Sequence, residues 1–312
     1  MQRPDNHQGV FTSIEELVAL RAQAGSLNLQ KKQRALAQMA GLRSSPFRGR
    51  GMDFEEVRLY QPGDDVRAID WRVTARTDVP HTKLYQEERE RPVFFIVDQR
   101  ASLFFGSRVV MKSVLAARLC ALLAWGCHNQ GDRIGGLIFG NSEHHELRPK
   151  DGRNGVLHFL QVLNGMNQQV QSDNLPDISL AHVLTAARRV IRPGSLVFLI
   201  SDFYDFDEAA QQALIPLSKH NEILAQWVYD PLEKELPPPG DYRFSANHQQ
   251  LTINTANSKA RQHFTQQFQK RFDTTQHQLN RLGIPLMPIA TGDDLTPLLR
   301  EQLGLSPVKR NA

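Results

Sequence analysis

The chain has 312 residues, of which 40% are hydrophobic and 22% are charged, as in an ordinary soluble globular protein. Its formal net charge of +4 comes from interleaved basic and acidic residues, so we expect a solvated surface and no nucleic-acid partner. No apolar run reaches the ~18 residues that a membrane span needs. The N-terminus also lacks the apolar core of a signal peptide, so we expect a cytoplasmic protein without a membrane span.

Residues 1–50 predict a helical extension followed by a linker. Ser13 and Glu16 form a capping-box pattern at the start of an amphipathic stretch, and Gly25-Ser26 breaks it. Residues 43–52 are rich in arginine, glycine and serine, which is typical of a connector. At the other end of the chain, we predict a disordered tail over residues 306–312.

From residue 92 onward, apolar strands alternate with amphipathic helices. The predicted strands are 93–97, 134–139, 144–147, 195–200, 223–229 and 284–289. The predicted helices are 107–127, 152–164, 179–191, one from about 207, 257–282 and 295–303, and a surface hairpin is expected over 242–253. Residues 92–305 therefore predict an α/β fold with a mostly parallel sheet and helices on both faces.

Acidic residues follow two of the buried strands. Asp98 ends the first strand and Asp202 follows the strand at 195–200, so both should face the crevice beyond the carboxyl ends of the sheet. Ser102 lies on the loop after Asp98, and Ser179 stands at the start of a predicted helix. Two carboxylates and two hydroxyls are hard oxygen donors that suit a magnesium ion.

The stretch from Asp53 to Arg76 is unusually dense in charged and aromatic residues, and it lies within a predicted segment, 51–91, that packs on the core. One interpretation is an acidic metal cluster of the nuclease kind made by Asp64, Asp65 and Asp70. The other is a docking extension whose acids pair with interleaved arginines. We favour the docking extension. Its candidate interaction residues are Arg58, Asp64, Asp65, Arg67, Asp70, Trp71 and Arg76.

Over about residues 45–230, the chain resembles the bacterial domain-of-unknown-function family fifty-eight, whose members are von Willebrand A-like. The matching positions before the first strand are Gly51, Phe54, Arg58, Tyr60, Pro62-Gly63-Asp64-Asp65, Arg67, Ile69-Asp70-Trp71, Ala75-Arg76 and 87–91. The later ones are Asp98, Ser102, Gly106-Ser107, Lys112 and Ser201-Asp202-Phe203. The resemblance implies a von Willebrand A-like fold and a partner that is a MoxR-type AAA+ ATPase, or another von Willebrand A protein.

The same resemblance implies a metal-ion-dependent adhesion site, with Asp98, Ser102, Ser179 and Asp202 as metal ligands. Arg100 departs from this motif because it stands where the first serine is expected. A guanidinium about 5 Å from a divalent ion would cost roughly 6 kcal/mol at an effective dielectric near 20. Arg100 could instead neutralise Asp98 and Asp202 itself, or point away and leave a weak magnesium site. The cofactor prediction is therefore none, or weakly bound Mg²⁺.

Our hypothesis is a non-enzymatic adaptor that docks through the crest, by which we mean the loops after Asp98, around Ser179 and after Asp202. In one version, a partner's acid completes the coordination of the ion, and in the other it meets Arg100 directly. The rival is a metal-dependent phosphoester hydrolase that uses the crest aspartates. The chain lacks a phosphate-binding P-loop and a G-x-S-x-G elbow, which weakens enzyme interpretations.

Overall fold

The computed structural model of the protein describes residues 9–27, 52–61, 69–87, 91–169, 178–246 and 249–304. The chain divides into two compact units, one formed by residues 1–42 and 91–312 and the other by residues 43–90. The boundaries predicted at residues 50, 91 and 305 stay a prediction.

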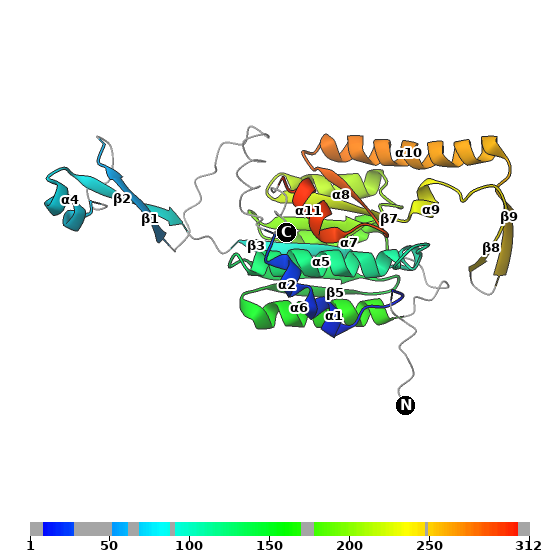
Figure 1. The fold of residues 1–312 in the computed structure, drawn as a ribbon, viewed down its shortest axis with the longest axis horizontal. Coiled ribbons are helices and arrows are strands. Elements are labelled where there is room, and N and C mark those ends of the chain that lie inside the picture. The colour runs from blue at the N-terminus through cyan, green and yellow to red at the C-terminus, as the bar shows by residue number, and fades with distance from the viewer. Residues whose placement is uncertain are drawn as a thin grey trace, which may run out of the picture. The chain divides into compact units, whose positions relative to one another are not determined.

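The larger unit is built on a six-stranded sheet with the order β10-β7-β6-β3-β4-β5 (Figure 1). The strands are β3 (Pro92–Asp98), β4 (Arg133–Phe139), β5 (His144–Lys150), β6 (Leu196–Ser201), β7 (Glu222–Tyr229) and β10 (Leu286–Ala290). All neighbours pair in parallel except β5, which runs antiparallel to β4 at one edge. This confirms the predicted α/β class with a mostly parallel sheet.

Helices cover both faces of this sheet, so its central strands are buried on both sides. The face that carries Phe95 packs against α1 (Ile14–Ala19), α2 (Arg21–Ala24), α5 (Lys112–His128), α6 (Gly152–Gln168) and α11 (Leu295–Gln302). The face that carries Phe94 packs against α7 (Leu180–Val190), α8 (Glu208–Ser218) and α10 (Ser258–Asn280). Alternate residues of β3 thus feed two separate apolar cores.

Close packing between β3 and β4 depends on a glycine. A Cβ added at Gly136 would lie 2.5 Å from the carbonyl oxygen of Phe95 and 2.7 Å from the ring of Phe159 on α6. The rings of Phe95 and Phe159 have centroids 5.5 Å apart. The absence of a side chain at residue 136 therefore lets α6 lie directly on the sheet.

The described part of the predicted N-terminal extension packs into the same unit. Ser13 caps α1 by accepting a hydrogen bond from the backbone N–H of Glu16 at 3.2 Å, as the sequence predicts. The indole of Trp125 on α5 donates to the carbonyl of Leu17 at 3.1 Å, and Leu17 is fully buried. The rest of the predicted extension lies outside the described residues.

The helix predicted to begin at Ser107 begins later. The N-cap residue of α5 is Met111, and Ser107 instead bonds to Asp230 after β7. A serine is favoured at an N-cap only if its hydroxyl can reach the free N–H groups of the first turn. Here a buried acid on another strand binds that hydroxyl.

The described residues of the smaller unit form a hairpin and one helix. Strands β1 (Met52–Leu59) and β2 (His81–Glu87) pair antiparallel, with a register shift between Phe54 and Glu56. Helix α4 (Trp71–Thr77) lies between them in the chain and is capped by Asp70. The larger unit also carries a separate hairpin, β8 (Asp241–Ala246) and β9 (Gln249–Asn254), and a short helix, α9 (Pro231–Lys234).

Candidate functional site

The candidate site lies where β3 and β6 end side by side. Val97 is paired with Ile200, so the next residues, Asp98 and Ser201, stand together at the carboxyl edge of the sheet. After β3 the chain continues to β4 on one side, and β6 leads to β7 on the other. The loops therefore diverge at this point, which is the position where ligands bind in open α/β sheets. Asp98, Ser201 and Asp202 are all buried.

Arg100 is the centre of this site, and all five of its guanidinium N–H groups are used inside the protein. Nε and Nη2 donate to the two oxygens of Asp98 at 3.0 and 2.8 Å. Nη1 and Nη2 donate to the two oxygens of Asp205, both at 2.8 Å. Nη1 also donates to the carbonyl of Ile178 at 3.1 Å. Arg100 is only 4% exposed, so in this conformation it has no N–H group left for a partner.

The carboxylate of Asp98 is equally saturated. Its Oδ1 accepts from the backbone N–H and from Nε of Arg100, both at 3.0 Å. Its Oδ2 accepts from Nη2 of Arg100 at 2.8 Å and from the hydroxyl of Ser201 at 2.7 Å. Burial raises the pKa of Asp98, and the Arg100 guanidinium opposes that rise. Four donors fill the four acceptor positions of an ionised carboxylate.

Asp205, on the loop after β6, is the second carboxylate that binds the Arg100 guanidinium. Besides Arg100, it accepts a hydrogen bond from the backbone N–H of Leu180 at the start of α7, at 2.8 Å. Burial alone would raise the pKa of Asp205, but the hydrogen bonds and charge of Arg100 outweigh burial and lower it. Arg100 therefore ties together the loops after β3 and β6 and the start of α7. One of the alternatives predicted from the sequence had Arg100 pair with Asp98 and Asp202, and in the structure its second acid is Asp205.

Asp202 belongs to a second network with Lys112, the first residue of α5. The ammonium of Lys112 donates to Asp202 at 3.1 Å and to Glu233 on α9 at 2.7 Å, and Lys112 is 1% exposed. Burial lowers the pKa of Lys112, but the two carboxylates outweigh burial and raise it. Each of the two ion-pair networks at the end of the sheet therefore combines one buried cation with two carboxylates of this chain.

Asp230, at the end of β7, was missed by the sequence analysis. It is fully buried and accepts hydrogen bonds from Ser107, from the hydroxyl of Thr291 at 2.6 Å and from the backbone N–H of Leu232 at 2.9 Å. Burial alone would raise the pKa of Asp230, but these hydrogen bonds outweigh burial, so its pKa is lowered. Its position directly after a buried strand was the same signal that pointed to Asp98. Nothing comparable in the sequence pointed to Asp205 or Glu233.

The four predicted metal ligands do not fit an octahedral magnesium site in this arrangement. Asp98 has no acceptor position left, and Asp202 is paired with Lys112. Ser102 is exposed on the loop after β3, and Ser179 uses its hydroxyl to cap α7 by accepting from the N–H of His182 at 3.2 Å. Across the described ranges, no group of three or more histidine, cysteine, aspartate or glutamate side chains could hold a metal ion.

The predicted interaction residues of the smaller unit are only partly described. Asp64, Asp65 and Arg67 lie outside the described residues. Asp70 caps α4 by accepting from the N–H groups of Arg72 and Val73 at 3.0 and 3.2 Å. Arg58 donates to the carbonyl of Leu59 at 3.0 Å. Trp71 is 67% exposed, and Arg76 is exposed too. Their roles in binding a partner stay a prediction.

Two solved structures share a distant likeness with this chain. One is BatB from Bacteroides thetaiotaomicron, with 13% identity and a TM-score of 0.44 over 69% of this chain and 97% of that one. The other is an aerotolerance-related membrane protein from Bacteroides fragilis, with 14% identity and a TM-score of 0.45 over 68% and 96%. Such low scores carry no argument about function. In the part of this chain that is described, no helix is long and apolar enough to cross a membrane.

Sequence comparison gives a firmer result. A family described as protein of unknown function DUF58 matches residues 56–274. Uncharacterized proteins from Mycobacterium bovis and Mycobacterium tuberculosis are each 34% identical over 225 residues, which cover 71% of this chain and 69% of theirs. The family match includes the segment before β3 from residue 56 onward, the Arg100 site and the strands around it. This chain therefore belongs to the DUF58 family of proteins of unknown function.

Proposed function

We propose that this protein is a non-enzymatic, cytoplasmic adaptor with a von Willebrand A-like fold, and that it docks partners through the crest. Its partner is proposed to be a MoxR-type AAA+ ATPase, with which it assembles or matures other complexes. Other von Willebrand A proteins are a second class of proposed partner. Each of these assignments comes from the family resemblance, and the geometry of the crest supports the way in which docking would work.

The observation that carries the proposal is the saturated pair of Arg100 and Asp98. In an adhesion site, a divalent ion neutralises the acids at the sheet edge and orders the loops around them. Here the guanidinium of Arg100 supplies that positive charge, and it also binds Asp205 and the carbonyl of Ile178, two residues before α7. A docking surface that is already ordered loses less conformational entropy when a partner binds.

The loops above this pair expose apolar side chains. Tyr204, directly before Asp205, is 74% exposed, and Val109 on the loop before α5 is 72% exposed. Large exposed apolar side chains, and aromatic ones above all, are typical of protein interfaces. In the smaller unit, Trp71 offers a similar exposed indole. We propose that Val109 and Trp71 each contact a partner. Direct contact of Arg100 with a partner's acid would require its internal hydrogen bonds to open first.

The test is affinity capture from a lysate of the native host, with bound proteins identified by mass spectrometry, in parallel with magnesium and with EDTA. We expect an AAA+ ATPase under both conditions, because Arg100 replaces the ion. Val109→Asp and Trp71→Ala should each reduce recovery, whereas Lys219→Ala, a change at an exposed lysine on the opposite end of α8, should not. Purified ATPase should then bind the purified protein directly.

Two results would contradict this function. One is the absence of any specific partner under both conditions. The other is turnover of a phosphoester substrate that depends on a divalent ion and is lost in Asp98→Asn, which would support the metal-dependent hydrolase instead. Recovery of the ATPase only with magnesium would show that the adhesion site binds an ion, and that Arg100 does not replace it.

A further inference from the structure

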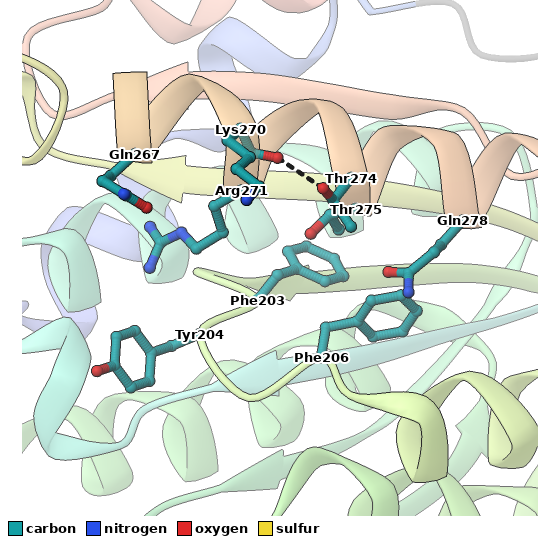
Figure 2. Close-up of a pocket in the computed structure, with 9 residues that line it drawn as sticks. All are labelled: Phe203, Tyr204, Phe206, Gln267, Lys270, Arg271, Thr274, Thr275 and Gln278. Carbon is teal, nitrogen blue, oxygen red and sulfur yellow. Dashed lines mark hydrogen bonds between the residues drawn. The ribbon is translucent and has the colours of Figure 1, made fainter. Parts of the chain in front are cut away.

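A hollow of about 270 Å³ lies beside the crest, between α10 and the loop that follows β6. Phe203, Tyr204 and Phe206 of the loop form one wall, and polar side chains of α10 form the other (Figure 2). Phe203 has a positive φ of 52°, which is uncommon for a residue with a large side chain. Its ring is buried against Trp227, at a centroid distance of 5.9 Å. The loop is therefore held in a constrained shape that turns Tyr204 outward.

Arg271 of α10 is the unusual group in this hollow. Its guanidinium lies 5.1 Å from the ring centroid of Trp227, 5.6 Å from that of Tyr204 and 5.8 Å from that of Phe268. These rings fix the position of the cation by cation–π attraction. Within the described part of the chain, Arg271 has no acidic partner, and its buried Nε has no hydrogen-bond acceptor. A buried donor without an acceptor is rare in folded proteins and calls for an explanation.

The charge of the hollow has one sign. Lys270 precedes Arg271 and also lines the hollow, whereas none of its described lining residues is acidic. The other polar groups of the α10 wall are uncharged amides and hydroxyls, from Gln267, Thr274, Thr275 and Gln278. Arg100 and Lys112 pair with acids of this chain, but among the described residues no acid forms an ion pair with Arg271 or Lys270. An anion from outside would complete this site.

We propose that this hollow binds an acidic side chain of a partner protein, with the carboxylate on Arg271 and Lys270 and the flanking residues against Tyr204. This rests on the proposed function only in assuming a protein partner. The faces of the Arg271 guanidinium lie against rings and its Nε is buried, so an incoming carboxylate would meet the N–H groups of the two terminal nitrogens, which match its two oxygens.

The size of the hollow favours a peptide over a free small molecule. A volume of about 270 Å³ is below the range of roughly 300–1,000 Å³ that is usual for small-molecule sites, so it suits one side chain. The lining residues Gln267 and Gln278 are eleven positions apart on α10, or about 16 Å along the helix axis. That distance is the length of about five residues of extended peptide. The exposed ring of Tyr204 would contact the residues next to the acid.

The probe is an array of octapeptides with a central glutamate and varied flanks, each also made with glutamine and with both termini blocked. We expect the full-length protein to bind its best glutamate peptides at least tenfold more tightly than their glutamine partners, measured by calorimetric titration. Arg271→Ala should remove this preference. Because Arg271 packs on three rings, Lys270→Glu serves as a second variant at an exposed position, and it should weaken glutamate peptides at least fivefold. Lys259→Glu, an exposed change elsewhere on α10, should change nothing.

Equal binding of glutamate and glutamine peptides would overturn the proposal. So would glutarate or inorganic phosphate binding as tightly as the best peptide, since the site would then take small anions. Affinity capture with Lys270→Glu separates this inference from the adaptor function. If Lys270→Glu still recovers the AAA+ ATPase and the natural protein shows no preference for glutamate peptides, the adaptor function stands and the acidic-peptide site fails. If the natural protein binds the peptides as expected but recovers no ATPase, the acidic-peptide site stands and the adaptor function fails.

Discussion

Arg100 and Asp98 form a bidentate ion pair inside the protein, with Nε–Oδ1 and Nη2–Oδ2 distances of 3.0 and 2.8 Å. The pair is almost wholly removed from solvent, and the same guanidinium also binds Asp205 through two N–H groups. A single arginine therefore fixes two loops that belong to neighbouring strands. Its energetic role can be measured separately from any partner.

Removing only Arg100 should be costly. Arg100→Met would leave Asp98 buried with a charge and two hydrogen bonds fewer, and it would release Asp205 as well. Breaking a buried pair by removing one member costs about 3–5 kcal/mol. In the double variant Asp98→Asn/Arg100→Met, the buried charge is gone, so part of the loss should be recovered. Urea unfolding of the three proteins checks this. A loss below about 1 kcal/mol in Arg100→Met would show that the pair is not formed as described.

Replacing Arg100 by the serine of the adhesion motif should create a magnesium site. Arg100→Ser frees one acceptor position on each oxygen of Asp98 and returns the missing hydroxyl, so hard oxygen ligands become available. We expect magnesium to raise the melting temperature of Arg100→Ser and to leave that of the natural protein unchanged. The control is Asp98→Asn/Arg100→Ser, in which the stabilisation should disappear. Magnesium stabilisation of the natural protein would contradict the saturated geometry.

The sequence predicted the strands and helices of the larger unit well, because apolar runs that are buried on both faces leave a clear pattern. It also placed Asp98 and Asp202 at the correct edge of the sheet. It could not assign their partners. Lys112 reaches Asp202 from 90 positions away in the chain, and Asp205 reaches Arg100 from 105 positions away. Only the folded path of each loop decides which cation meets which carboxylate. The predicted start of α5 at Ser107 was wrong for the same reason, since the hydroxyl of Ser107 donates to Asp230 and does not cap the helix.

Two glycines should respond to alanine in opposite directions. Gly136→Ala places a methyl group 2.5 Å from the Phe95 carbonyl, which cannot move without disturbing β3, so we expect a loss of about 1–3 kcal/mol or more. Gly165 lies within α6 with no atom within 4 Å of an added Cβ, so Gly165→Ala should stabilise by about 0.4–1 kcal/mol. Chemical unfolding measures both. Destabilisation by Gly165→Ala would contradict the packing of α6.

Lys112 should contribute to stability, because it is buried, unlike most lysines. Lys112→Met keeps an unbranched side chain that is one atom shorter, but it leaves Asp202 and Glu233 without their shared cation. Since Glu233 is more exposed than Asp202, we expect a loss of about 2–4 kcal/mol, at the lower side of the range for buried pairs. Lys219→Met, at an exposed lysine, should change the free energy of unfolding by less than about 0.5 kcal/mol. Equal effects of the two variants would contradict a structural role for Lys112.

Asp132, before β4, should make the protein less stable as the pH rises. Burial raises its pKa to about 6, while the backbone N–H and the charge of Arg91 partly oppose this rise. The folded state therefore binds more protons than the unfolded state between the ordinary value of 3.8 and about 6. The contribution of Asp132 to stability is most favourable below this window, and it falls as the pH rises through it. Above the window, the ionised and buried carboxylate carries its full penalty.

Asp132→Asn removes that penalty, and its amide oxygen can still accept from the N–H of Arg91, which Asp132 does at 3.3 Å. We expect Asp132→Asn to stabilise the protein by about 1–3 kcal/mol at pH 8 and by almost nothing near pH 4. Urea unfolding of both proteins across this pH range measures the difference directly, and only its change with pH reports the titration of Asp132. Glu301→Gln, at an exposed acid on α11, should show no such change. A difference that is constant with pH would mean that Asp132 titrates normally and acts only through packing.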